Sequence, residues 1–209
     1  NSTFQQSSLP VFLSDDSSFT SSQKEFAAFL YAGNQYSTNW CSKETWSTSG
    51  DSLCYFIETA LLYGLFPEDN HADAIKAIRN KFVGDSSGKN DRKDASLWAK
   101  VDIMLTDAFI QIVKDIKIGR LPDDSISLRK DSVLSNEFYQ QQLNAVFSNG
   151  LISTIESLEP KQPEYLLLKS GIKKFLDGAD YRKFTIIPYP EKNQQKFKQL
   201  LQKRLYEGG

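Results

Sequence analysis

Few residues of this chain have the types that nucleophilic catalysis requires. The 209 residues include one histidine, His71, and two cysteines, Cys41 and Cys54. A catalytic thiol or hydroxyl needs a base beside it, and that base is usually a histidine oriented by a third group. His71 stands at the predicted start of a helix, where a polar side chain caps the helix or faces solvent. Because no motif pairs it with either cysteine, we predict that the chain has no catalytic residues and is not an enzyme.

Paired carboxylates could act as acid and base on a glycoside, and the 26 acidic residues offer candidate pairs such as Asp102 with Asp107 and Glu156 with Glu159. Asp102 is the most informative of them. A helical projection places it at the edge of an apolar stripe, where an ionised group needs a partner. Thr106, one turn later, or a backbone amide could donate to it. We predict a buried structural hydrogen bond at Asp102 and keep a carboxylate-pair glycoside hydrolase as an alternative function.

Composition excludes several classes of partner. The chain has 25 lysines and arginines against 26 acidic residues, so it lacks the basic surface that phosphate contacts require, and we expect no nucleic acid partner. One histidine and two cysteines cannot supply a four-ligand zinc site, and no Gly-rich phosphate loop is present. We expect neither a metal nor a cofactor. The most apolar stretch, residues 53–66, is interrupted by Glu58 and is too short to span a bilayer.

The two cysteines, Cys41 and Cys54, are too few for a disulfide framework, although one pair is possible. We favour two unpaired thiols, because a free cysteine behaves as a small hydrophobe and is commonly buried. A Cys41–Cys54 bridge is the alternative.

Aromatic and polar residues are mixed between residues 34 and 50, where Tyr36, Trp40 and Trp46 lie. This composition is typical of a packed loop more than of a linker, because exposed tryptophans would leave a large apolar area in water. The alternative is that these three rings hold a sugar or a peptide, which would make the chain a free-standing binding module.

Periodic apolar residues and capping residues predict helix after helix along the chain. The expected helices cover residues 21–33, 52–64, 70–83, 94–118, 135–149, 152–158, 163–177 and 194–206, and residues 184–187 form the one convincing extended run. The helix at 94–118 has apolar residues on more than one side, so we expect it to be the most buried element. The fold class is therefore predicted to be all-α, with little or no strand.

Three stretches carry a resemblance to a known family. The first runs from Leu30 through Tyr36 and Trp40 into residues 60–71, the second covers residues 101–109 and ends at Gly119 and Arg120, and the third covers residues 158–165. In their order, they resemble the N-terminal scaffold domain of the large murein L,D-transpeptidases, which cross-link peptidoglycan through a catalytic cysteine. Asp107 lies in the second stretch, and the resemblance implies structural polar roles for it and for Arg120. The family pattern is broken at Asn70, where it has tyrosine, and at Gln162, where it has histidine.

The resemblance implies a non-catalytic scaffold that positions the binding and catalytic domains of a parent transpeptidase. Peptidoglycan would then be a partner only through the parent, whose catalytic cysteine would lie downstream, so neither Cys41 nor Cys54 inherits that role. The implied location is the periplasm or cell envelope, with a signal or lipid anchor upstream of Asn1. Such a compartment would permit the Cys41–Cys54 bridge.

The expected organisation has three parts. Residues 1–20 form an extended entry segment, residues 21–190 form the helical scaffold domain, and residues 191–209 form a linker helix. The resemblance implies that this helix leads toward a peptidoglycan-binding domain.

Overall fold

The structure is a computed structural model, and it describes residues 21–42, 44–83, 93–120, 134–179, 184–187 and 194–208. Within these ranges the chain forms eight α-helices, two 3₁₀ helices and one two-stranded hairpin, which confirms the all-α prediction. The predicted entry segment 1–20 and the predicted domain boundary at residue 190 lie outside the described residues. The chain divides into two compact units, Asn1–Ile172 and Lys173–Gly209, which are described separately.

The elements follow the order α2 (Ser21–Gly33), β1 (Cys41–Ser42), β2 (Thr45–Trp46), α3 (Thr48–Glu58), η1 (Ala60–Tyr63), η2 (Pro67–Asn70), α4 (Ala72–Val83), α5 (Ala95–Lys117), α6 (Asn136–Asn149), α7 (Leu151–Leu158), α8 (Pro163–Asp177) and α9 (Gln194–Gly208).

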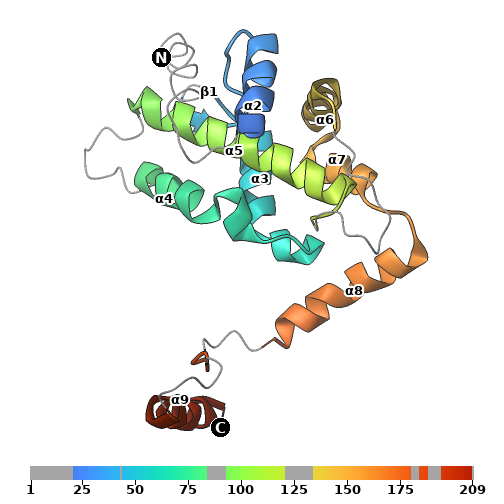
Figure 1. The fold of residues 1–209 in the computed structure, drawn as a ribbon. Helices are drawn as coiled ribbons and strands as arrows, with labels where there is room; N and C mark the ends of the chain where they lie inside the picture. The colour runs from blue at the N-terminus through green and yellow to red at the C-terminus, as the bar shows by residue number, and fades with distance from the viewer. Residues whose placement is uncertain are drawn as a thin grey trace. The chain divides into compact units, whose positions relative to one another are not determined.

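The long helix α5 is the centre of the first unit. It runs between α2 on one side and α3 and α4 on the other, with α6 and α7 beside its C-terminal half (Figure 1). Every residue from 101 to 110 is buried. This is the predicted consequence of apolar residues on several sides, because each side has a neighbouring helix to pack against. Asp94 caps its N-terminus by accepting the hydroxyl of Ser96 at 2.6 Å and the amide of Ser96 at 2.8 Å, and the hydroxyl bond is the main cause that lowers the pKa of Asp94.

The start of α3 differs from the sequence-based expectation. The sequence pattern predicts a helix that begins at residue 52, whereas the structure begins the helix at Thr48 with Ser47 as its N-cap. The Ser47 hydroxyl accepts the amide of Gly50 at 3.0 Å, so a serine that resembled part of a loop in fact starts the helix. The helix also ends earlier, at Glu58, and a 3₁₀ turn carries the chain to Gly64, which takes the left-handed conformation with φ 71°.

The chain reverses sharply after α2, and this turn places the residues of the site. Gln35 and Tyr36 have positive φ values of 50° and 54°, which are uncommon for residues other than glycine. The amide of Tyr36 donates to the carbonyl of Tyr31 at 2.8 Å, which closes the turn. Asn39 and Trp40 are thereby directed back toward α5, immediately before the short β1–β2 hairpin pairs Cys41 with Trp46.

Helices α8 and α9 have no buried residue, unlike the helices that surround α5. In the first unit α8 is held at Glu159, which follows α7 and accepts the Tyr165 hydroxyl at 2.8 Å and the Lys169 ammonium at 2.7 Å. In the second unit, residues 184–187 form no strand. Instead, the amide and hydroxyl of Thr185 each donate to the Glu207 carboxylate on α9 at 2.6 Å.

Tyr139 gives the fold a testable dependence on alkaline pH. Its ring is 2% exposed, lies 5.0 Å from the ring of Phe26, and so joins α6 to α2. Burial, with the nearby carboxylate of Asp115, raises the pKa of the Tyr139 phenol to about 12. An unfolded tyrosine ionises near pH 10. The contribution of this group to stability is therefore complete below pH 10 and is lost as pH rises through about 12.

We expect Tyr139→Phe to reduce the alkaline loss of stability. Between pH 10 and pH 12, the free energy of unfolding of the variant should fall by about 2 kcal/mol less than that of the wild type. Urea unfolding followed by circular dichroism at several pH values measures this difference. Parallel curves for the two proteins would contradict the assignment.

Candidate functional site

Asp102 lies at the centre of a buried hydrogen-bond network on α5. Its side chain is 0% exposed. It accepts the Tyr31 hydroxyl at 2.6 Å, the backbone amide of Asn39 at 3.0 Å and the backbone amide of Trp40 at 2.7 Å, and the Cys41 thiol lies at 3.4 Å. The burial of Asp102 and its backbone donors agree with the expectation from the helical projection. We call Tyr31, Asn39, Trp40, Asp102 and Thr106 the Asp102 network.

Thr106 extends this network by one helical turn. The Tyr31 and Thr106 hydroxyl oxygens are 2.8 Å apart, and the Trp40 indole donates to Thr106 at 2.9 Å. Because the Tyr31 proton is directed at Asp102, the Thr106 proton is left to donate to Tyr31. Thr106 therefore reaches Asp102 through Tyr31 and not directly. The network holds α2 on α5, and it also holds there the loop between residues 34 and 50, which we call the aromatic loop.

The Tyr31 hydroxyl and the Cys41 thiol keep their protons beside Asp102. Burial is the main reason that the pKa of Asp102 is raised, and the hydrogen bonds from Tyr31 and the two amides oppose that rise. Burial and the facing Asp102 carboxylate raise the pKa values of Tyr31 and of Cys41 well above their ordinary values. The Cys41 thiol consequently stays protonated near neutral pH, a state that is poor for nucleophilic attack.

Cys41 and Cys54 are both buried free thiols in this structure. The favoured interpretation of two unpaired cysteines therefore describes the structure, and the alternative bridge between them is not formed. Cys41 lies next to Asp102 at the start of the hairpin. Cys54 is a buried residue of α3, and burial raises the pKa of its thiol.

A second group of polar contacts fastens the turn at η2 to α5. His71, in the left-handed conformation at φ 56°, ends η2, and its Nε2 lies 2.7 Å from Oδ2 of the buried Asp107. Arg120 donates through Nε and Nη2 to Asp69 at 2.9 and 2.7 Å, and its guanidinium lies 4.4 Å from the centre of the Phe66 ring. The His71 side chain was expected to cap the start of a helix or to face solvent. Instead, its backbone ends η2 and its side chain contacts Asp107, a long-range partner that sequence reasoning did not find.

The aromatic loop does not form the binding surface that its composition suggested as an alternative. Trp40 is 0% exposed, and its ring lies 5.5 Å from that of Phe109. Trp46 is half-buried, with its ring edge-on to Trp98 at 5.2 Å. Tyr36 is half-buried against the core. Trp40 has no exposed surface for a ligand, so these three rings do not together hold a sugar, whereas Tyr36 and Trp46 each keep part of their surface exposed.

The candidate carboxylate pairs are likewise placed in structural contacts. Asp102 and Asp107 are 0% and 3% exposed. Glu159 is 7% exposed and is held by Lys169, whereas Glu156 faces solvent. None of these carboxylates lines either of the two cavities described here. This arrangement does not support glycoside hydrolysis, which needs two carboxylates facing a space for sugar and water.

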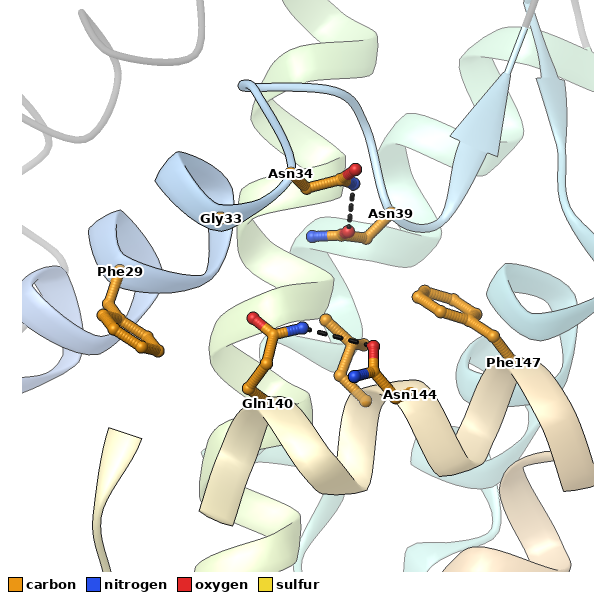
Figure 2. Close-up of a pocket in the computed structure, with 8 residues that line it drawn as sticks. Phe29, Gly33, Asn34, Asn39, Gln140, Asn144 and Phe147 are labelled. Carbon is orange, nitrogen blue, oxygen red and sulfur yellow. Dashed lines mark hydrogen bonds between the residues drawn. The ribbon is translucent and has the colours of Figure 1, made fainter. Parts of the chain in front are cut away.

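An open cavity of about 490 Å³ lies between the end of α2, the turn that follows it, and α6. Figure 2 shows Asn34 and Asn39 on one side and Gln140 and Asn144 on the other, with Phe29 and Phe147 at opposite ends. Its wall is completed by Gly33 and Leu143. Sequence reasoning missed these residues, although Gln140 and Asn144 stand four apart on α6, a spacing that places two amides on one helix face.

A smaller cavity of about 290 Å³ lies where η1 approaches the C-terminal end of α5. It is lined by Tyr63, Asp115, Lys117, Arg120 and Tyr165, among others. Arg120 is already paired with Asp69 there. In the part of the chain that the structure describes, no group of histidine, cysteine and acidic residues is arranged to hold a metal ion. None of the described helices is both long and apolar enough to cross a membrane.

Comparison with known proteins gives one match. A family model described as a scaffold domain matches residues 25–171. These residues extend from α2 into α8 and include the whole Asp102 network and the turn at η2. They also include the residues of the cavity between α2 and α6, which we call the amide-lined cavity after Asn34, Asn39, Gln140 and Asn144. No curated protein and no solved structure matches the chain.

Proposed function

Because the chain belongs to the Scaffold domain family, we propose that it is the non-catalytic scaffold of a cell-envelope L,D-transpeptidase. In this proposal it positions the peptidoglycan-binding and catalytic domains of the parent enzyme, which act on peptidoglycan in the periplasm. Its partners are those other domains, and peptidoglycan is reached through them.

One observation carries the proposal: the residues of the family-like stretches meet on α5. Tyr31 and Trp40, from the first stretch, bond to Asp102 and Thr106 of the second. His71, at the end of the first stretch, pairs with Asp107. The residues of the family-like stretches thus form the hydrogen bonds and the ion pair that hold neighbouring segments on α5.

A helical body held rigid by such internal contacts suits a scaffold more than a catalyst. Catalytic domains lose large factors in rate when the parts that position substrate shift by about 1 Å, so a rigid support has a direct effect on turnover. A helix with ten consecutive buried residues from 101 to 110 provides such a support. The protonated state of Cys41, imposed by burial and by Asp102, fits a chain that leaves the cysteine chemistry to another domain.

Deletion within the parent tests this proposal. We expect a parent lacking residues 1–190 to form several-fold fewer L,D-cross-links in cells, because its catalytic domain is no longer positioned. Muropeptide analysis of one strain background expressing the full-length, deleted and catalytic-cysteine-substituted parents measures the effect, with immunoblots to equalise protein levels. Wild-type cross-linking by the deleted form, or turnover of muropeptides by this chain alone, would overturn the proposal.

A further inference from the structure

The amide-lined cavity between α2 and α6 has no charged residue among the described residues that line it. A phosphate or carboxylate placed there would lose hydration without gaining a counter-charge, which is costly. Its volume of about 490 Å³ falls within the range of small-molecule sites. The ligand that fits this wall is therefore small, neutral and rich in hydrogen-bonding groups.

Asn39 supplies an unused donor at this wall. Its residue is 7% exposed, its Oδ1 accepts the Asn34 amide at 3.0 Å, and its Nδ2 has no hydrogen-bond partner among the described residues. The position of Asn39 is fixed, because its backbone amide donates to Asp102. A buried amide donor without an acceptor is unfavourable, so an acceptor on a ligand would be favoured at this position.

The opposite wall can adjust to such a ligand. Gln140 and Asn144 hold each other by one exposed hydrogen bond of 3.3 Å, which is long and contributes little. Rotation of these two side chains would turn further amide donors and acceptors toward a ligand in the cavity. Phe29 and Phe147, 39% and 48% exposed, present partly bare rings at the ends of the cavity.

We infer that this cavity binds a neutral N-acetylated sugar, with the acetamido oxygen accepting from Asn39 Nδ2. Four amide side chains match the hydroxyl and acetamido groups of such a sugar, and the two phenylalanine rings match the apolar faces of its pyranose rings. The described residues of the wall offer no counter-charge to a charged ligand, so a neutral one is favoured. The inference goes beyond the scaffold role and stands on the cavity alone, so it does not depend on the identity of the parent enzyme.

Two substitutions separate ligand binding from folding. Asn39→Ala removes the unpartnered donor and keeps the backbone amide that serves Asp102. Gly33→Leu adds a side chain to the cavity wall. A Cβ at Gly33 would lie 3.5 Å from Gln140 Oε1, an ordinary contact, so the backbone tolerates the change while the rest of the leucine fills the cavity. Gly171→Ala, on α8 with open space around it, is the matched control.

The test is a titration of the ¹⁵N-labelled chain with N,N′-diacetylchitobiose, followed by backbone amide shifts. We expect saturable shifts confined to residues 29–40 and 140–147. Affinity should fall about tenfold in Asn39→Ala, which corresponds to one lost hydrogen bond. Binding should be abolished in Gly33→Leu and unchanged in Gly171→Ala. Thermal unfolding of each variant establishes that it is folded.

Three companion probes complete the test. Cellobiose, which has hydroxyls and no acetamido group, should bind several-fold more weakly, and a uronic acid disaccharide should not bind. The inference is overturned if diacetylchitobiose produces no saturable shifts, or if the folded Gly33→Leu variant binds it like the wild type. Equal or tighter binding of the blocked dipeptide N-acetyl-alanyl-alanine amide would also overturn it, in favour of a peptide ligand.

Discussion

Replacement of Asp102 by alanine should lower the free energy of unfolding by about 3 to 5 kcal/mol. The change leaves the Tyr31 hydroxyl and the backbone amides of Asn39 and Trp40 buried without their acceptor. Each unsatisfied group of this kind costs about 1 to 3 kcal/mol. Because these donors lie in the segments that pack α2 and the aromatic loop on α5, the loss should be shared by the whole first unit.

Two further variants identify the cause of this loss. Asp102→Asn keeps the shape and one acceptor oxygen, so we expect a smaller loss of about 1 to 3 kcal/mol. Asp73→Ala removes an exposed acidic residue from the first turn of α4, so it should cost no more than about 1 kcal/mol. Urea unfolding at neutral pH measures all three. An Asp102→Ala protein as stable as Asp73→Ala would show that the network contributes little.

The second large effect is expected at Gly50, in the first turn of α3. A Cβ built at this position would overlap the carbonyl oxygen of Trp40. That carbonyl cannot easily move, because it accepts the amide of Ser47 at 3.0 Å and the hydroxyl of Ser47 at 2.9 Å. We expect Gly50→Ala to cost about 3 kcal/mol or more, since relief requires a shift of backbone on both sides of the contact.

Gly171→Ala is the matched control for this substitution. Gly171 lies inside α8, and nothing comes within 4 Å of a Cβ built there. Alanine is the better helix former, so this variant should gain about 0.5 to 1 kcal/mol. Thermal unfolding of both variants measures the contrast. If Gly50→Ala melts at or above the temperature of Gly171→Ala, the close approach of α3 to the hairpin is wrong.

Local signals in the sequence predicted much of the fold. Ser135 is the N-cap of α6, as predicted from a capping residue followed by an apolar period, and the predicted start of the long helix near residue 94 agrees with its N-cap at Asp94. The burial of α5 followed from its apolar residues on several sides. These signals succeed because each depends on residues within a few positions of one another.

The errors arose where the deciding partner is distant in the sequence. The start of α3 was missed because Gly50 resembled a loop residue. The structure requires glycine there because the carbonyl of Trp40 occupies the space that a Cβ would take, and Trp40 is in another segment. Trp40 was a binding candidate because its partner Thr106 lies 66 residues away. The amide-lined cavity brings Asn39 to α6, and no local pattern could predict that juxtaposition.

The most direct test of the scaffold role is the level of L,D-cross-links in cells whose parent enzyme carries Gly50→Ala, compared with Gly171→Ala and the wild type. Limited proteolysis of each purified parent would establish that only the scaffold is destabilised and that the catalytic domain stays folded. The proposed function predicts a several-fold loss of cross-links with Gly50→Ala and wild-type cross-linking with Gly171→Ala. Wild-type cross-linking by a parent whose scaffold is demonstrably unfolded would contradict it.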